Sequence, residues 1–319
     1  MSLLLKNYKK ILVIKHGALG DLINAMGAFE AIRHNHRQAH IILLTSPAYI
    51  NLMTETGYFD EIVGDARSRN PLTTWKLRSR LLKLNVERVY DLQNSDRTAL
   101  YFKLLGPGKR PEWSGVATGC SHPQMRKDHK QLHAFVRFAK QLKIAGLDLK
   151  GQDELFPDLS WLKKDVNHLN LPENAVLLVP GSSLRGAYKR WPAEKYAELA
   201  LWLKNEGFNP VLLGGPDDIE VVNRIIKIFP TIHNLSQKIN FFEIGALACK
   251  ALAIIGNDTG AIHLAAAMKC PTLILWPHPL APELYAPRGK HVKVLRLPNL
   301  SDSNLKEVQE AVREILMHN

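Results

Sequence analysis

The segment LAIIGNDTGAIHLAAAMKCPTLILW, residues 252–276, constrains the fold of this chain more than any other segment. An apolar run with the length of a buried strand leads into Asn257-Asp258-Thr259-Gly260, and an alanine-rich helical run follows directly. A strand followed at once by a helix is the repeating unit of a parallel α/β sheet. In such a sheet this junction lies at the carboxyl edge, where ligands bind.

The junction carries residues that suit a phosphorylated ligand. The first N–H groups of a helix attract anions, and Thr259 and Gly260 offer such groups. Asp258 can accept hydrogen bonds from sugar hydroxyls, and His263 projects from the first helical turn. An aspartate or threonine at this position is also an ordinary helix N-cap without any ligand, and this alternative stays open.

The length and composition fit a two-domain globular protein. The chain has 319 residues, of which 46% are hydrophobic and 23% charged, and a single core rarely extends beyond about 250–300 residues. No apolar run reaches the roughly 18 residues of a membrane-spanning helix. The N-terminal apolar run is too short for a signal peptide, so we expect a cytoplasmic protein. The three cysteines show no metal-ligand spacing.

The net positive charge is confined to the first half of the chain. Residues 1–150 contain 24 lysines and arginines against 12 aspartates and glutamates, whereas residues 151–319 contain 18 of each kind. A field of one sign on one domain indicates an anionic partner, such as nucleic acid, an acidic membrane surface or a phosphorylated substrate. A generally basic protein without such a partner is the alternative.

Short apolar runs alternate with amphipathic segments along both halves, which predicts an α/β protein with parallel sheets. The expected strands are 10–15, 40–46, 59–65, 88–93, 175–183, 209–215, 231–236, 252–258, 271–276 and 291–297. A basic and less regular stretch follows from Gly106 to Lys130. The polar residues near 151–157 mark a boundary between domains 1–155 and 156–319. We expect two Rossmann-like domains facing each other across a cleft, with the last helix, 302–317, either completing the second domain or packing back on the first.

The loop after the first strand, Lys15-His16-Gly17-Ala18-Leu19-Gly20-Asp21, contains two glycines and one carboxylate. Gly17 and Gly20 permit a tight turn, but their spacing fits neither the dinucleotide-binding nor the P-loop motif. Asp21 suits a general base that acts on a neutral hydroxyl. A carboxylate that merely stabilises the helix start is the alternative.

The loops of the second half carry cations and carboxylates. Ser182 ends an expected strand, and Lys189 and Arg190 follow it just before a proline-started helix, where cations can neutralise a diphosphate. A solvated basic loop is the alternative. Asp217 and Asp218 begin the next helix, where they suit either ribose hydroxyls or an N-cap.

Four segments together resemble the successive motifs of the lipopolysaccharide heptosyltransferase family of glycosyltransferases, which adopt the GT-B fold. They are KILVIKHGALGDLINAMGAFEAI, YDLQNSDRTALYFKLLG, the KRWP element and NDTGAIHLAAAMKCPTLILW, and the match runs from about residue 10 to about residue 290. The resemblance implies an inverting enzyme that transfers heptose from ADP-heptose to the inner core of lipopolysaccharide. It implies no metal and no cofactor beyond the nucleotide sugar, and peripheral association with the cytoplasmic face of the inner membrane.

The resemblance also implies roles for particular residues. Asp21 matches the proposed catalytic base of the family, and Lys189 matches its phosphate-binding lysine. We expect the donor to be bound by Gly17, Gly20, Ser182, Lys189, Arg190, Asp217, Asp218, Asp258, Thr259, Gly260 and His263. The anionic acceptor is expected to contact basic residues of the stretch 106–130, namely Arg126, Lys127, His129 and Lys130. For these four, a solvated loop is the alternative.

Two other functions stay open. After residue 276 the chain reads Pro277-His278-Pro279, where the family often continues with Phe-Gly and a polar triplet. A hexosyltransferase or another GT-B sugar-nucleotide enzyme of cell-envelope biosynthesis is therefore an alternative. A nucleic-acid-binding protein could use the basic half, but the sequence has no zinc, helix-turn-helix or RNP signature, and we expect no nucleic-acid partner.

Overall fold

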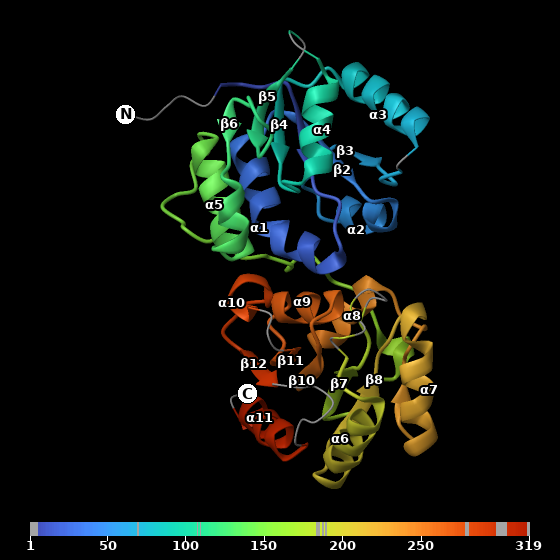
Figure 1. Cartoon of the computed structure of the whole chain (residues 1–319). Coiled ribbons are helices and arrows are strands. Elements are labelled where there is room, and N and C mark those ends of the chain that lie inside the picture. Colours follow the sequence, from blue (N-terminus) through green and yellow to red (C-terminus); the bar gives the residue numbers. More distant parts are fainter. Residues whose placement is uncertain are drawn as a thin grey trace. The chain divides into compact units, whose positions relative to one another are not determined.

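The structure is a computed structural model, and it describes residues 6–68, 70–106, 108, 110–182, 186, 188, 190–277, 281–297 and 305–317. The chain divides into two compact units, Met1–Asp158 and Leu159–Asn319. Figure 1 colours the first unit from blue to green and the second from green to red.

The first unit contains one parallel sheet of six strands, in the order β3-β2-β1-β4-β5-β6. Its strands are β1 (Lys10–Ile14), β2 (His40–Thr45), β3 (Glu61–Gly64), β4 (Arg88–Asp91), β5 (Glu112–Gly115) and β6 (His122–Pro123). Its helices are α1 (Leu19–Asn35), η1 (Pro47–Tyr49), α2 (Ile50–Thr54), α3 (Pro71–Leu84), α4 (Asp96–Leu104), η2 (Arg126–Lys130) and α5 (Ala134–Ile144). Helices α1 and α5 pack against each other, whereas α3 and α4 cover a core on the strands that contains Leu81, Phe102 and Val89.

The second unit repeats this topology, with the strand order β12-β11-β10-β7-β8-β9. Its strands are β7 (Ala175–Val179), β8 (Asn209–Leu212), β9 (His233–Asn234), β10 (Ala253–Asn257), β11 (Thr272–Pro277) and β12 (Val292–Leu297). Its helices are η3 (Asn167–Leu169), α6 (Ala193–Asn205), η5 (Pro216–Asp218), α7 (Ile219–Ile228), α8 (Phe241–Ala248), α9 (Gly260–Ala267), α10 (Pro282–Tyr285) and α11 (Leu305–Met317).

Strand β7, AVLLV, shows why these sheets are continuous apolar runs in the sequence. Val176 and Leu178 point into a core with α6, α7 and α11, and Leu177 and Val179 point into a second core with α8 and α9. A parallel strand that is covered on both faces needs apolar side chains at every position. The last helix, α11, uses its apolar residues in the first of these cores, and a contact of this helix with the first unit stays a prediction.

The structure corrects the expectation for the basic stretch 106–130. Instead of being irregular throughout, it contributes β5 and β6, which extend the first sheet, and the short helix η2. Only four and two residues pair in these strands, and so short a run gives no clear periodicity in the sequence.

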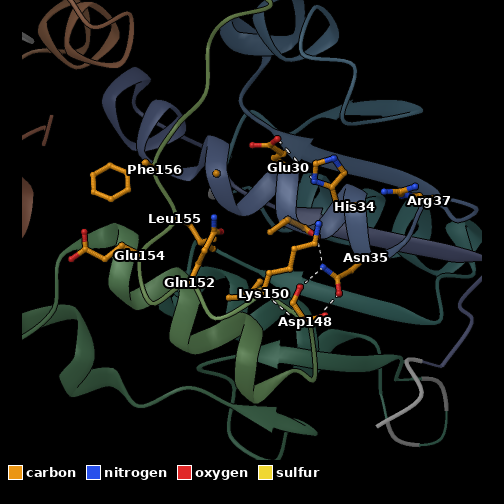
Figure 2. A pocket seen from close by; sticks show the side chains of 13 residues that line it. Glu30, His34, Asn35, Arg37, Asp148, Lys150, Gln152, Glu154, Leu155 and Phe156 are labelled. Carbon is orange, nitrogen blue, oxygen red and sulfur yellow. Dashed lines mark hydrogen bonds and ion pairs between the residues drawn. The ribbon is translucent and has the colours of Figure 1, made fainter. Parts of the chain in front are cut away.

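The segment after α5 runs along the outer side of α1. Asn35 donates its amide to the carbonyl of Asp148 and accepts the Asp148 N–H, each at 2.9 Å. Figure 2 shows the shallow groove between α1 and residues 148–156, where Glu30 and His34 face Lys150 and Gln152. The groove lies along the C-terminal half of α1, whereas α1 begins at the carboxyl edge of the sheet. The groove is therefore separate from the loops at the carboxyl edge that are described below.

Gly27 of α1 allows this segment to approach the helix. A Cβ atom at position 27 would lie 2.4 Å from the carbonyl oxygen of Phe156 and 2.7 Å from that of Leu155. We expect Gly27→Ala to lower the free energy of unfolding by roughly 1–3 kcal/mol, because backbone carbonyls must shift to make room. Urea denaturation measures this loss.

Gly245 of α8 supplies a matched control. A Cβ atom there would meet the Cδ atoms of Leu162 at 2.8 and 2.9 Å, and a leucine side chain can rotate away. Gly245→Ala also gains helix propensity, as Gly27→Ala does. A loss for Gly27→Ala no larger than that for Gly245→Ala contradicts the prediction.

Candidate functional site

Both sheets have a topological switch point. In the first unit β1 and β4 are neighbours, and in the second β7 and β10 are neighbours, with the chain continuing outward in opposite directions from each pair. The loops that follow such a pair diverge at the carboxyl edge, and ligands of open α/β sheets bind there. Most of the expected site residues lie in three of these four loops, after β1, β7 and β10.

The loop after β1 turns at Gly17, which has a φ of +99°. A Cβ atom at this position would also lie 2.8 Å from the ring of Tyr49, so glycine is needed for two reasons. Gly20 and Asp21 lie in the first turn of α1. The Asp21 side chain is exposed, and one of its carboxylate oxygens accepts the N–H of Ala18 at 3.1 Å. Asp21 therefore stabilises the helix start and still presents a carboxylate to solvent.

A buried hydrogen-bonded group holds this loop in place. His16 Nε2 lies 2.9 Å from Asp65 Oδ2, and the Tyr101 hydroxyl donates to the same oxygen at 2.6 Å. The N–H of His16 donates to the side chain of Gln93 at 3.0 Å. Burial alone would raise the pKa of Asp65, but the hydrogen bonds from His16 and Tyr101 lower it to about 2. The sequence reasoning missed this group, because its members come from four separate segments.

Two buried charged side chains lie beneath the same edge. Lys15 follows β1 and Asp91 ends β4. Asp91 Oδ1 accepts the N–H groups of Gln93 and Asn94, and its Oδ2 is buried without a partner among the described residues. Burial raises the pKa of Asp91 to about 6. Burial also lowers the pKa of Lys15, and the charges of Asp21 and Asp91 oppose this shift.

In the second unit, Asn257 ties the loops after β7 and β10 together. Its Oδ1 accepts the Trp191 N–H and the Tyr196 hydroxyl, each at 3.1 Å. Its Nδ2 donates to the carbonyls of Pro180 at 2.7 Å and Gly181 at 3.2 Å. The side chain is fully buried, and all of its hydrogen-bonding groups are used. Asn257 was not among the expected site residues.

The residues that follow Asn257 form the junction between β10 and α9. His263 Nε2 lies 3.2 Å from Asp258 Oδ1, with both side chains almost buried. Thr259 is the N-cap residue of α9, which begins at Gly260, but its side chain makes no capping hydrogen bond. Its hydroxyl oxygen is buried and has no partner within the described parts of the chain. The ordinary capping alternative therefore does not account for Thr259.

Ser182, Arg190 and Asp218 form one network with each other. The Arg190 guanidinium donates to the carbonyl of Ser182 at 2.6 Å and lies 3.4 Å from Asp218 Oδ1. Asp218 accepts the N–H groups of Ser182 at 3.2 Å and Gly215 at 2.9 Å, and burial raises its pKa. The Asp218 carboxylate also fills the space in which a Cβ atom of Gly181 would stand. These side chains order the two loops from which a ligand would be contacted.

Asp217 and Lys189 are the other donor residues expected in these two loops. Asp217 is exposed in η5, and its carbonyl accepts from Arg190 at 3.3 Å. Lys189 lies outside the residues that the structure describes.

The expected acceptor residues all lie in η2. This helix follows β6, which is separated from β1 by β4 and β5. Arg126 pairs with Asp96 at 2.8 Å, and Lys127 is exposed. The side chains of His129 and Lys130 lie outside the description.

No group of three or more histidines, cysteines, aspartates and glutamates among the described residues is placed to hold a metal ion. No described helix is both long and apolar enough to cross a membrane.

Two Rossmann-like domains, each with polar residues in the loops at its switch point, are the arrangement of the GT-B fold. The glycosyl transferase family 9 protein from Veillonella parvula superimposes with a TM-score of 0.81 at 20% identity, covering 100% of this chain and 99% of that one. ADP-heptose lipopolysaccharide heptosyltransferase II of Escherichia coli superimposes with a TM-score of 0.76 at 23% identity, covering 97% and 99%. The expected fold class is confirmed.

The sequence comparisons place the chain in a family. It is 27% identical over 310 residues to lipopolysaccharide heptosyltransferase 2 of E. coli strain K12, covering 90% of this chain and 88% of that protein. The model of glycosyltransferase family 9 (heptosyltransferase) matches residues 74–314. The chain belongs to this family and is a glycosyltransferase, which confirms the resemblance found in the sequence.

The buried carboxyl of Asp91 gives a pH-dependent prediction. Because its pKa is raised from 3.8 to about 6, the folded protein retains a proton that the unfolded chain releases, and stability falls as the pH rises through this range. We expect the wild type to lose up to about 3 kcal/mol of unfolding free energy relative to Asp91→Asn between about pH 4 and about pH 6. Urea denaturation across the range measures the difference. Asp96→Asn, at a side chain that is 91% exposed, is the control, and the same pH profile in both variants disproves the assignment.

Asn257→Asp tests the link between the two loops of the second unit. The change keeps the accepting oxygen but replaces the donating amide with a carboxylate that faces two carbonyl oxygens in a buried site. We expect a loss of roughly 2–5 kcal/mol in unfolding free energy. Asn209→Asp is the control, because the Asn209 amide donates to the carbonyl of Glu173 at an exposed position. Equal losses in the two variants would show that the buried Asn257 hydrogen bonds stabilise the protein no more than an exposed amide hydrogen bond does.

Proposed function

We propose that this chain transfers heptose from ADP-heptose, with inversion, to the inner core of lipopolysaccharide at the cytoplasmic face of the inner membrane. The element after β10 carries the proposal. The Thr259 hydroxyl is buried without a partner among the described residues, at the start of a helix whose N–H groups attract phosphate oxygens. Asp258 and His263 flank it as a hydrogen-bonded pair.

In the proposed reaction an acceptor hydroxyl oxygen attacks the anomeric carbon of the donor sugar. A new carbon–oxygen bond forms as the bond to the β-phosphate breaks, and ADP leaves with the electron pair. The hydroxyl proton passes to the exposed carboxylate of Asp21. The single displacement inverts the anomeric configuration.

The leaving diphosphate gains negative charge during the reaction. Groups that bind it more strongly in the transition state lower the barrier. We assign this role to the amino end of α9 and to Lys189, which matches the phosphate-binding lysine of the family. Arg190 contributes by ordering the loop around Ser182. We propose that neither a metal ion nor another cofactor takes part.

The acceptor is assigned to the first unit. Its sequence carries most of the positive charge excess of the chain, with 24 lysines and arginines against 15 aspartates and glutamates, and the inner core of lipopolysaccharide is anionic. Arg126, Lys127, His129 and Lys130 are proposed contacts, together with the carboxyl edge at β1 and β4.

The activity is tested by release of the nucleoside diphosphate, ADP or UDP according to the donor, with purified inner-core acceptor. ADP-heptose is compared with ADP- and UDP-hexoses in the presence of EDTA, and mass spectrometry identifies the product. Turnover with a hexose donor alone supports the hexosyltransferase alternative. Thermal protection by an oligonucleotide, but by no nucleotide sugar, refutes the proposed donor.

Asp21→Asn is the sharpest test of the reaction. The asparagine oxygen can still accept the Ala18 N–H, so the start of α1 should be retained, whereas a carboxamide cannot act as a base. We expect kcat to fall by a factor on the order of 10² to 10⁴ with nucleotide affinity near that of the wild type. Retention of more than about a tenth of kcat, with chemistry rate-limiting, leaves Asp21 as a structural helix start.

A further inference from the structure

Helix α3 presents large apolar side chains to solvent on its outer side. Trp75 is 64% exposed and Leu72 is 70% exposed, and a spacing of three residues puts them on the same side of the helix. Leu81 is buried and Leu77 and Leu84 pack against the core of the first unit, so the inward face is already filled by other residues. Figure 1 shows α3 at the outside of this unit, away from α1 and α5.

The same outer side is basic. Lys76, Arg80 and Lys83 are all exposed, at positions that flank Leu72 and Trp75 on the helical surface. Between residues 66 and 86 the sequence contains six lysines and arginines and no aspartate or glutamate. Exposed apolar groups with cations beside them fit an anionic surface that also has an apolar interior.

The helix is fixed at its inner side. The Arg78 guanidinium donates to the carbonyl of Leu104 at 2.7 Å, and the Asn70 side chain accepts the Leu72 N–H at 2.9 Å as the N-cap. Because α3 begins just after β3, Leu72 and Trp75 lie at the end of α3 that is nearest the carboxyl edge, where the acceptor is proposed to bind.

We propose that α3 docks the protein on an anionic phospholipid bilayer, with Leu72 and Trp75 in the interfacial region and Lys76, Arg80 and Lys83 at the lipid phosphates. Tryptophan favours the membrane interface, and cations are attracted by an anionic leaflet. The inference extends the proposed function, because the inner core is carried by a lipid. The vesicle-binding test uses no donor and no acceptor, so a failure of membrane docking can be distinguished from a failure of the proposed transfer reaction.

Co-sedimentation of the full chain with vesicles measures the docking. We expect binding to vesicles of phosphatidylcholine and phosphatidylglycerol, weakening with salt, and none to phosphatidylcholine alone. Each of Lys76→Gln and Lys83→Gln should weaken binding by about fivefold, since one cation near an anionic leaflet is worth about 1 kcal/mol. Lys227→Gln, on an exposed position of α7, is the control and should bind like the wild type.

The apolar contribution is tested in the same way. Leu72→Gln with Trp75→Gln should weaken binding to the anionic vesicles by at least tenfold. Ile219→Gln with Ile228→Gln is the matched control, because both isoleucines are 44% exposed on α7. Brominated phosphatidylglycerol should quench the tryptophan fluorescence of the wild type. Trp75→Phe should bind the vesicles but show much less quenching, and this difference places Trp75 in the bilayer.

Two outcomes overturn the proposal. One is vesicle binding by the α3 variants that equals that of the controls. The other is the absence of binding to anionic vesicles by the wild type.

Discussion

Both sheets depend on strands that are parallel and covered on two faces. Such strands pair all of their backbone groups within the sheet and carry apolar side chains throughout, as β7 does. Polar chemistry is thereby excluded from the strands and moved to the residues that follow them. The parallel arrangement gathers these residues at one edge, and the switch point separates the loops enough to admit a ligand.

The functional loops rest on buried polar groups that are satisfied by one another. Asn257 fastens two loops of the second unit with four hydrogen bonds, and Asp65 fastens the loop before Asp21 through His16. Buried polar groups are costly unless fully bonded, so these loops have few other conformations available. Residues of these loops can therefore be held in place without being buried themselves, as the exposed carboxylate of Asp21 is.

The sequence predicted ten of the twelve described strands closely, all except β5 and β6, because a run such as LAIIGND is unambiguous when turn residues bound it. It also predicted the junction at Asp258, since a strand ending in polar residues before a helix has one place in a parallel sheet. It could not predict the role of Asn257, whose partners lie between 61 and 77 residues away. Nor could it show that the Thr259 side chain makes no capping hydrogen bond to α9, or that Asp218 accepts the N–H of Gly215, because both depend on side-chain orientation.

The outer strands of the sheets bear on association between copies of the chain. Strands β6 and β9 end their sheets with two residues each, which leaves little backbone for a strand of another molecule to pair with. The opposite edge of the second sheet, β12, is longer, but it carries Lys293 and Arg296, which pair with Glu314 and Glu283. Short and charged edges oppose edge-to-edge aggregation. A protein with two open sheets can on this account remain dispersed at high concentration while its strands stay strongly apolar.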